Sequence, residues 1–284
     1  MRFVREPAVS SMFYPDDPTK LRKDIETYLK CAVVPDLEEN VIGIISPHAG
    51  YMYSGKVAAY GFKMIEKRSI DTVILIGPSH RAYFEGVALW DRGSFETPLG
   101  RTDIDEDIAG EIVNIHGIIK PNMDTHREEH SLEVQLPFLQ SVLDSFKIIP
   151  LVMGIQTSSA SRELVESLSK VLQASKKKFL VVGSTDLSHY YPYAEAKKLD
   201  DVIVGHLDTF NIPGMIEDIE TGKTEACGAG PIIATMMLSE KLGADHGTVL
   251  KYANSGDVSG DKSGVVGYVS AVFYRKQQNE RGNP

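Results

Sequence analysis

Two histidines follow predicted buried strands in the same way. Asn40–Gly50 reads NVIGIISPHAG and Asp71–His80 reads DTVILIGPSH, so in each segment a short apolar run is followed by a proline and then a histidine. Such runs are typical of strands buried on both faces, and proline ends the strand ladder. If the two strands are parallel neighbours, His48 and His80 reach one edge of the sheet with a backbone spacing of about 5 Å, close enough to share a metal ion. The alternative is two turn histidines that are hydrogen-bonded to the backbone.

Further reactive side chains follow a third predicted strand and precede a helix. Asp186 and His189 come just after Lys178–Gly183, and this spacing suits orientation of a ligand, proton transfer or metal binding. Alternatively, Asp186 caps a helix and His189 lies on the surface. Cys227 stands in EACGAGP, where a glycine-rich turn and a helix N-terminus favour a thiolate that binds a metal or acts as a nucleophile. The alternative is a small buried filler, which is also how we interpret Cys31.

The segment from His126 to His130 matches H-x-x-E-H, a zinc-protease pattern. That mechanism needs both histidines on one face inside a helix, and here the apolar helix begins only after them. Its predicted stripe is Leu132, Leu136, Leu139, Leu143 and Phe146. We therefore expect no protease of this kind. His130 directly precedes the predicted helix and either reaches the edge of the sheet as an acid or base or lies exposed.

The surrounding pattern predicts an α/β fold. The strands Val41–Ser46 and Val73–Ile76 flank a helix at Val57–Glu66, which forms a right-handed βαβ unit. Gly86–Arg101 reads as a hairpin that adds an antiparallel portion. We predict one domain over residues 1–284, with a mixed, mainly parallel central sheet and helices on both faces. An extended arm over residues 1–18 and a frayed tail over residues 276–284 complete the prediction.

Composition limits the classes of partner. The chain has 284 residues, 42% of them hydrophobic, and a formal net charge of −9, which argues against nucleic acid or an anionic membrane as the main partner. No apolar run approaches the ~20 residues that span a bilayer, and the N-terminus lacks the apolar region of a signal peptide. Two cysteines provide no disulfide framework. We expect a soluble cytoplasmic protein with a small-molecule or peptide ligand, and leave open whether it forms a homo-oligomer.

A series of ordered segments resembles the Memo family, which is named for mediating receptor-driven cell motility in animals and has many archaeal and bacterial members. The resemblance covers nearly the whole chain, through REPAVSSMFYP, SPHAGYMYSG, GPSH, ETPLG, EEHSLEVQLPFL, STDLSHY, ACGAGP and SGDVSGDKSGVVGYVSAVF. It implies a single α/β domain similar to the class III extradiol dioxygenases, which are non-haem iron enzymes.

The resemblance also implies a metal site. Those dioxygenases hold iron with two histidines and a carboxylate, whereas the Memo set is similar to two histidines and a cysteine, which correspond here to His48, His80 and Cys227. A thiolate in place of the carboxylate shifts the preference toward Cu(I), Zn(II) or thiolate-bound iron. The polar positions around the same cleft match His130, Asp186 and His189.

Three functions follow as hypotheses. The first is a metal-binding, redox-related protein with a non-haem site, for which iron is the expected ion and copper or zinc are alternatives. In it, His130 and His189 handle protons and Asp186 orients a ligand. The second is a non-catalytic module that binds a peptide or phosphopeptide in the same cleft. The third is a metal-dependent hydrolase that uses His189 or His130 as a base.

Overall fold

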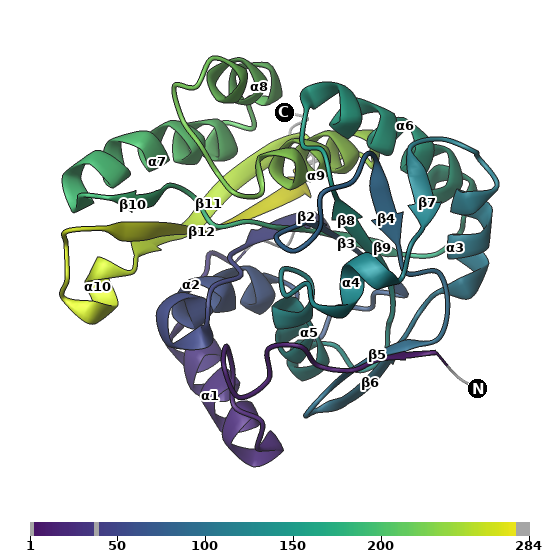
Figure 1. The fold of residues 1–284 in the computed structure, drawn as a ribbon, viewed down its shortest axis with the longest axis horizontal. Coiled ribbons are helices and arrows are strands. Elements are labelled where there is room, and N and C mark those ends of the chain that lie inside the picture. Colours follow the sequence, from purple (N-terminus) through teal and green to yellow (C-terminus); the bar gives the residue numbers. More distant parts are fainter. Residues whose placement is uncertain (1–2, 37–39, 277–284) are drawn as a thin grey trace, which may run out of the picture.

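A large mixed sheet forms the core of the computed structural model, which describes residues 3–36 and 40–276 (Figure 1). Within these residues the sheet has nine strands, and its four middle strands are parallel. In spatial order they are β2 (Asn40–Ser46), β9 (Phe179–Ser184), β3 (Thr72–Pro78) and β8 (Lys147–Met153). Apart from their first residues, these strands are buried along their length, as expected for Val/Ile/Leu-rich runs covered on both faces.

Antiparallel pairing appears on both sides of this parallel centre. β12 pairs antiparallel with β2, β10 and β11, and β4 pairs antiparallel with β8 and parallel with β7. The outer strands are β10 (His189–Tyr191), β11 (His246–Asn254), β12 (Val265–Arg275), β4 (Val87–Leu89) and β7 (Ile119–Pro121). The predicted mixed, α/β architecture is confirmed.

Helices cover both faces of the sheet, as predicted. Figure 1 shows one group on one face, formed by α1 (Pro18–Cys31), α2 (Tyr51–Met64) and α5 (Leu136–Val142). The opposite face carries α6 (Ser158–Ala174), α7 (Tyr193–Asp208), α8 (Ile212–Glu220) and α9 (Ala229–Lys241). The shorter elements are α3 (Glu106–Val113), α4 (Asp124–Arg127), α10 (Gly256–Ser259) and the buried 3₁₀ helix η1 (Glu133–Gln135).

The hairpin predicted for residues 86–101 is wrong. The fully buried β4 joins the main sheet, whereas the hairpin is formed by β5 (Ser94–Thr97) and β6 (Gly100–Asp103) in a separate sheet with β1 (Val4–Arg5). Gly93 explains the change of course. It has φ +79°, and a side chain there would meet the Phe3 carbonyl at 1.8 Å, so the chain turns away beneath the N-terminal arm.

The long helix predicted from Leu132 is also wrong in extent. Of the apolar stripe, only Leu136 and Leu139 lie in α5; Leu132 precedes η1, and Leu143 is already extended. Pro137 accounts for the late start, because proline is accommodated in the first turn of an α-helix and not in its interior.

The ends of the chain bear on the remaining predictions. The described part of the N-terminal arm is only partly extended: β1 is followed by a turn, in which the Phe13 amide donates to the Val9 carbonyl at 2.8 Å, before the helix that Asp17 caps. Residues 1–2 and 277–284, with most of the predicted tail, lie outside the described residues. Among residues 3–36 and 40–276, no helix has the length and apolarity needed to cross a membrane.

Candidate metal centre

Three histidines meet at the carboxyl edge of the parallel strands. His48 follows β2, His80 follows β3, and His130 lies in the turn before η1. The ring centroids are 5.0 Å apart for His48 and His80, 5.4 Å for His48 and His130, and 4.6 Å for His80 and His130. One ring nitrogen from each lies within 4.8 Å of the others, so these nitrogens can surround one ion.

The predicted arrangement of the strands that carry His48 and His80 is wrong in one respect. β2 and β3 are not neighbours, because β9 lies between them. His48 and His80 therefore converge over the end of β9 and do not lie side by side on adjacent strands. The intervening strand contributes its own last residue, Ser184, to the support of the site.

Hydrogen bonding fixes the tautomer of His48. Its Nδ1 lies 2.9 Å from Ser184 Oγ, and that hydroxyl donates its single hydrogen to the Ser131 carbonyl at 2.6 Å while it accepts from Gln135 Nε2 at 3.0 Å. Nδ1 of His48 must then be the donor. The other nitrogen, Nε2, keeps its lone pair and faces the centre. Burial, followed by the neighbouring His80 and His130, holds the pKa of His48 well below its usual range, so the ring is neutral.

Glu129 performs the same task for His80. One carboxylate oxygen accepts from His80 Nδ1 at 3.0 Å, and the other accepts from the His80 backbone amide at 2.5 Å. Burial acts to raise the pKa of Glu129, but hydrogen bonds from His80 and from the Ser131 amide outweigh it and lower the pKa to about 2. An ionised carboxylate only accepts, so His80 carries its hydrogen on Nδ1 and leaves Nε2 free.

His130 has no such support. Its Nδ1 is buried without a hydrogen-bond partner and lies 3.4 Å from the nearer Glu129 oxygen. Burial is the main cause that lowers the pKa of His130 to about 4. The ring of Phe13 packs edge-on against it at 4.9 Å between centroids. A buried nitrogen without a partner is costly, and a bound cation would satisfy it.

The sulfur of Cys227 contacts His48 but is not one of the three mutually close ligand atoms, which all come from histidines. Sγ lies 3.1 Å from His48 Nε2 and 3.2 Å from the backbone nitrogen of Asp186, which donates to it. Burial and then the charge of Asp186 raise the pKa of the Cys227 thiol in the absence of a metal, and a cation at the centre would act in the opposite direction. The loop of Cys227 is tied down by Gln156, whose Nε2 donates to the Cys227 carbonyl at 2.8 Å.

Asp186 and His189 lie beside this group. The buried Asp186 carboxylate accepts from the His48 backbone amide at 2.8 Å, and burial is the main cause that raises its pKa to about 6. It caps no helix, since β10 follows and α7 begins only at Tyr193, so the capping alternative is wrong. His189 donates from Nδ1 to the Leu187 carbonyl at 2.7 Å.

His126 is separate from the centre. Its Nε2 lies 3.1 Å from the Ala88 carbonyl, and its buried ring contacts those of Trp90 and Phe95. The two histidines of the H-x-x-E-H segment therefore serve different places. Glu129 in the same segment, together with Ser184 and Gln135, escaped the sequence analysis, and the only signal was the position of Glu129 next to His130.

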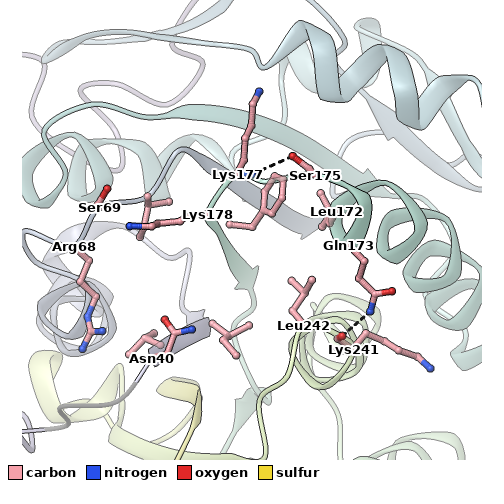
Figure 2. Close-up of a pocket in the computed structure, with 14 residues that line it drawn as sticks. Asn40, Arg68, Ser69, Leu172, Gln173, Ser175, Lys177, Lys178, Lys241 and Leu242 are labelled. Atoms are coloured by element: carbon pink, nitrogen blue, oxygen red, sulfur yellow. Dashed lines mark hydrogen bonds between the residues drawn. The ribbon is translucent and has the colours of Figure 1, made fainter. Parts of the chain in front are cut away.

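A cavity of about 560 Å³ lies at the opposite edge of the sheet (Figure 2). It is bordered by Asn40 at the start of β2 and Phe179 at the start of β9, with no histidine, cysteine or carboxylate among its described lining residues. Its polar groups serve helix ends: Arg68 Nε donates to the Met64 carbonyl, and Gln173 Nε2 donates to the Lys241 carbonyl at 2.8 Å. This cavity and the ligating atoms are thus at different edges.

Comparisons with known proteins show which family the chain belongs to. The family model described as "Memo-like protein" matches residues 5–272. The MEMO1 family protein of Methanopyrus kandleri is 40% identical over 280 residues, which cover 95% of this chain and 99% of that protein. The MEMO1 family proteins of Sulfolobus acidocaldarius and Methanobrevibacter smithii are 39% and 36% identical, with the same shares of both chains. The chain belongs to the Memo family.

Proposed function

We propose that the carboxyl-edge centre binds a transition-metal ion through His48, His80 and Cys227, and that the protein is redox-related. The observation that carries this proposal is the orientation of the donors. His48 and His80 each have one nitrogen committed to a protein acceptor and the other directed at the centre, which is how histidine ligands are ordinarily held. The contact of the Cys227 sulfur with His48 Nε2 at 3.1 Å supports Cys227 as the proposed third ligand, in a set of two nitrogens and one sulfur.

The donor chemistry suggests which ions fit. Neutral imidazoles with a thiolate suit iron, copper or zinc, and we propose iron as the physiological ion by similarity to the non-haem dioxygenases. When bound, such an ion would supply Lewis acidity and, for iron or copper, electron transfer. The His80 side chain is 28% exposed and that of His130 is 12% exposed, so solvent and small ligands reach the centre from the His80 side.

The remaining polar residues are proposed to position groups and move protons. Asp186 holds the backbone of His48 and, through its own amide, the sulfur of Cys227. Only Nδ1 of His189 is bonded to the Leu187 carbonyl, so Nε2 can accept or return a proton at the edge of the centre. We propose the same role for the free nitrogen of His130.

The direct test is metal analysis after anaerobic reconstitution with Fe(II), and in parallel with Cu(I) and Zn(II). We expect about one equivalent in the wild type, a large loss in Cys227→Ala and no loss in Cys31→Ala, whose thiol is exposed and remote in the fold. In the absorption spectrum of the Co(II) form we expect a thiolate charge-transfer band, which should be absent in Cys227→Ala and present in His130→Ala. If His130→Ala loses the ion and Cys227→Ala keeps it, the third ligand is His130.

Two assays separate the alternative functions. Oxygen uptake with catechols tests the oxygenase class, and turnover of esters or amides under nitrogen would point instead to metal-dependent hydrolysis. Affinity for a phosphopeptide that persists after chelation, without oxygen uptake, would favour a binding module. A wild type that takes up no metal under any of these conditions would overturn the proposal.

A further inference from the structure

The N-terminal arm passes behind the turn that carries Glu129 and His130. Arg5 in this arm is only 2% exposed, which is unusual for arginine. Its guanidinium donates from Nε to the His126 carbonyl at 3.0 Å and from Nη2 to the Glu129 carbonyl at 2.5 Å. Nη1 forms an ion pair with Glu133, so all three bonds go to the same short stretch of chain.

Glu133 is the acceptor on which the arm converges. Its side chain is fully buried and accepts from Arg5, from the amides of Ala8 at 2.8 Å and Val9 at 3.1 Å, and from the Tyr14 hydroxyl at 2.5 Å. Four donors use the acceptor capacity of a carboxylate. Glu133 therefore has no lone pair left for an ion or a proton at the centre, although it lies three residues from His130.

The same arm also contacts the centre directly. Phe13 packs its ring against His130, and its carbonyl accepts from the Tyr51 amide at 2.7 Å. Tyr51 in turn donates from its hydroxyl to the Val134 carbonyl at 2.6 Å. The backbone around His130 is thus held from the arm, from α2 and from Glu133.

We infer that Arg5 and Glu133 are positioning residues of the histidine centre. Their buried pair fixes the backbone of Glu129 and His130, which sets the carboxylate that orients His80 and the direction of the His130 ring. The ligand geometry thus depends on a segment more than 120 residues away in sequence. This inference rests on the proposed metal function for its effect on affinity, but its structural part stands without a metal.

The first test is titration with Co(II), followed by the absorption of the bound ion. We expect Glu133→Gln to weaken Co(II) binding by roughly 10–100-fold, as loss of a group that orients ligands commonly does, and Tyr14→Phe to weaken it by a smaller factor. Tyr14→Phe removes one donor and keeps the ion pair, so it serves if Glu133→Gln does not fold.

The matched control is Asp105→Asn. Asp105 is also fully buried and bonded to a cation, Lys177 at 2.7 Å, and to the Thr72 hydroxyl at 2.5 Å, but it lies at the amino edge of the sheet. It should lower the melting temperature without changing Co(II) affinity. If the Glu133 and Tyr14 variants lose stability while they bind Co(II) as the wild type does, the inference is overturned.

The second test needs no metal. Long-range ¹H–¹⁵N spectra of histidine-labelled protein report ring tautomers, and we expect Nδ1–H forms for His48 and His80 in the wild type. Glu133→Gln or Tyr14→Phe should shift the ring signals of His80 and His130, and leave those of His206, which is bonded to Asp218 on the far helices, unchanged. Unchanged His80 and His130 signals would contradict the inference. If the wild type binds no Co(II), the metal proposal fails and these spectra alone decide the positioning role.

Discussion

The two edges of the sheet each contain a buried carboxylate paired with a cation, but the pairs serve different ends. At the carboxyl edge, Glu133 and Arg5 bind the backbone of the turn that carries His130 and Glu129. At the amino edge, Asp105 and Lys177 lie near the starts of β3 and β9, and Lys177 also borders the cavity that has no histidine, cysteine or carboxylate in its described lining. Cavity volume is therefore a poor guide to the position of the ligating side chains in this protein. Donor atoms with one fixed partner and one free lone pair are the better guide.

The largest difference should appear in stability when each cation is removed. Arg5→Met leaves the fully buried Glu133 charge without its partner, which costs about 3–5 kcal/mol. Lys177→Met should cost clearly less, because the Lys177 side chain is one-third exposed, so solvent screens this pair, and Asp105 keeps the hydrogen bond from Thr72. Urea unfolding of both variants measures the difference, and equal losses would show that the two pairs are equivalent.

Substitutions at the two edges should also differ in their effect on metal affinity. We expect His48→Ala to lower the affinity for Co(II) or Fe(II) more than about 100-fold, since it removes a ligand and not only a supporting group. Lys241→Ala, at the rim of the amino-edge cavity, should leave it unchanged. Anaerobic titration measures both, and a comparable loss in the lysine variant would place metal binding elsewhere.

The edges should also respond to acid at different pH. Burial lowers the pKa of His126 to about 3, while the Ala88 carbonyl and Glu129 oppose this and Arg5 adds to it. Below about pH 6.5 the unfolded chain therefore binds a proton that the native state does not bind. As the pH falls, the free energy of unfolding decreases by ~1.4 kcal/mol per pH unit. From pH 6.5 to 5 the wild type should lose about 2 kcal/mol more than His126→Gln.

The amino edge should resist acid for longer. Although burial acts to raise the pKa of Asp105, hydrogen bonds from Lys177 and Thr72 lower it below its usual range. The stability from this pair is present above the unfolded pKa of about 3.9 and is lost only as the pH falls below it. Denaturant midpoints of Asp105→Asn should therefore follow the wild-type pH trend between pH 6.5 and 5, and a divergence there would contradict the assignment.

Two glutamines give the finest comparison. Gln156 holds the Cys227 carbonyl at one edge, and Gln173 holds the Lys241 carbonyl at the other, both at 2.8 Å. Each change to alanine should cost about 1 kcal/mol of stability. Only Gln156→Ala should also alter the thiolate band of the Co(II) form, because only this glutamine fixes a loop of the centre.

The sequence predicted the parts of the site that depend on local patterns. An apolar run, a proline and a histidine placed His48 and His80 correctly beyond β2 and β3, because burial and strand termination are local properties. The supports were missed because they are long-range: Ser184 meets His48 across 136 residues, and Glu129 meets His80 across 49. The hairpin predicted for residues 86–101 is wrong for the same reason, because its first strand, β4, pairs with β8, which is distant in sequence.

The bonds of Arg5 also bear on how the molecule is assembled. Glu133 is made 128 residues after its partner Arg5, and Cys227 is made 179 residues after His48. Closing such loops costs chain entropy before any contact repays it, so these contacts belong late in folding. A nascent chain that has not reached Cys227 lacks this sulfur, so the full proposed donor set can capture an ion only after that residue has been made.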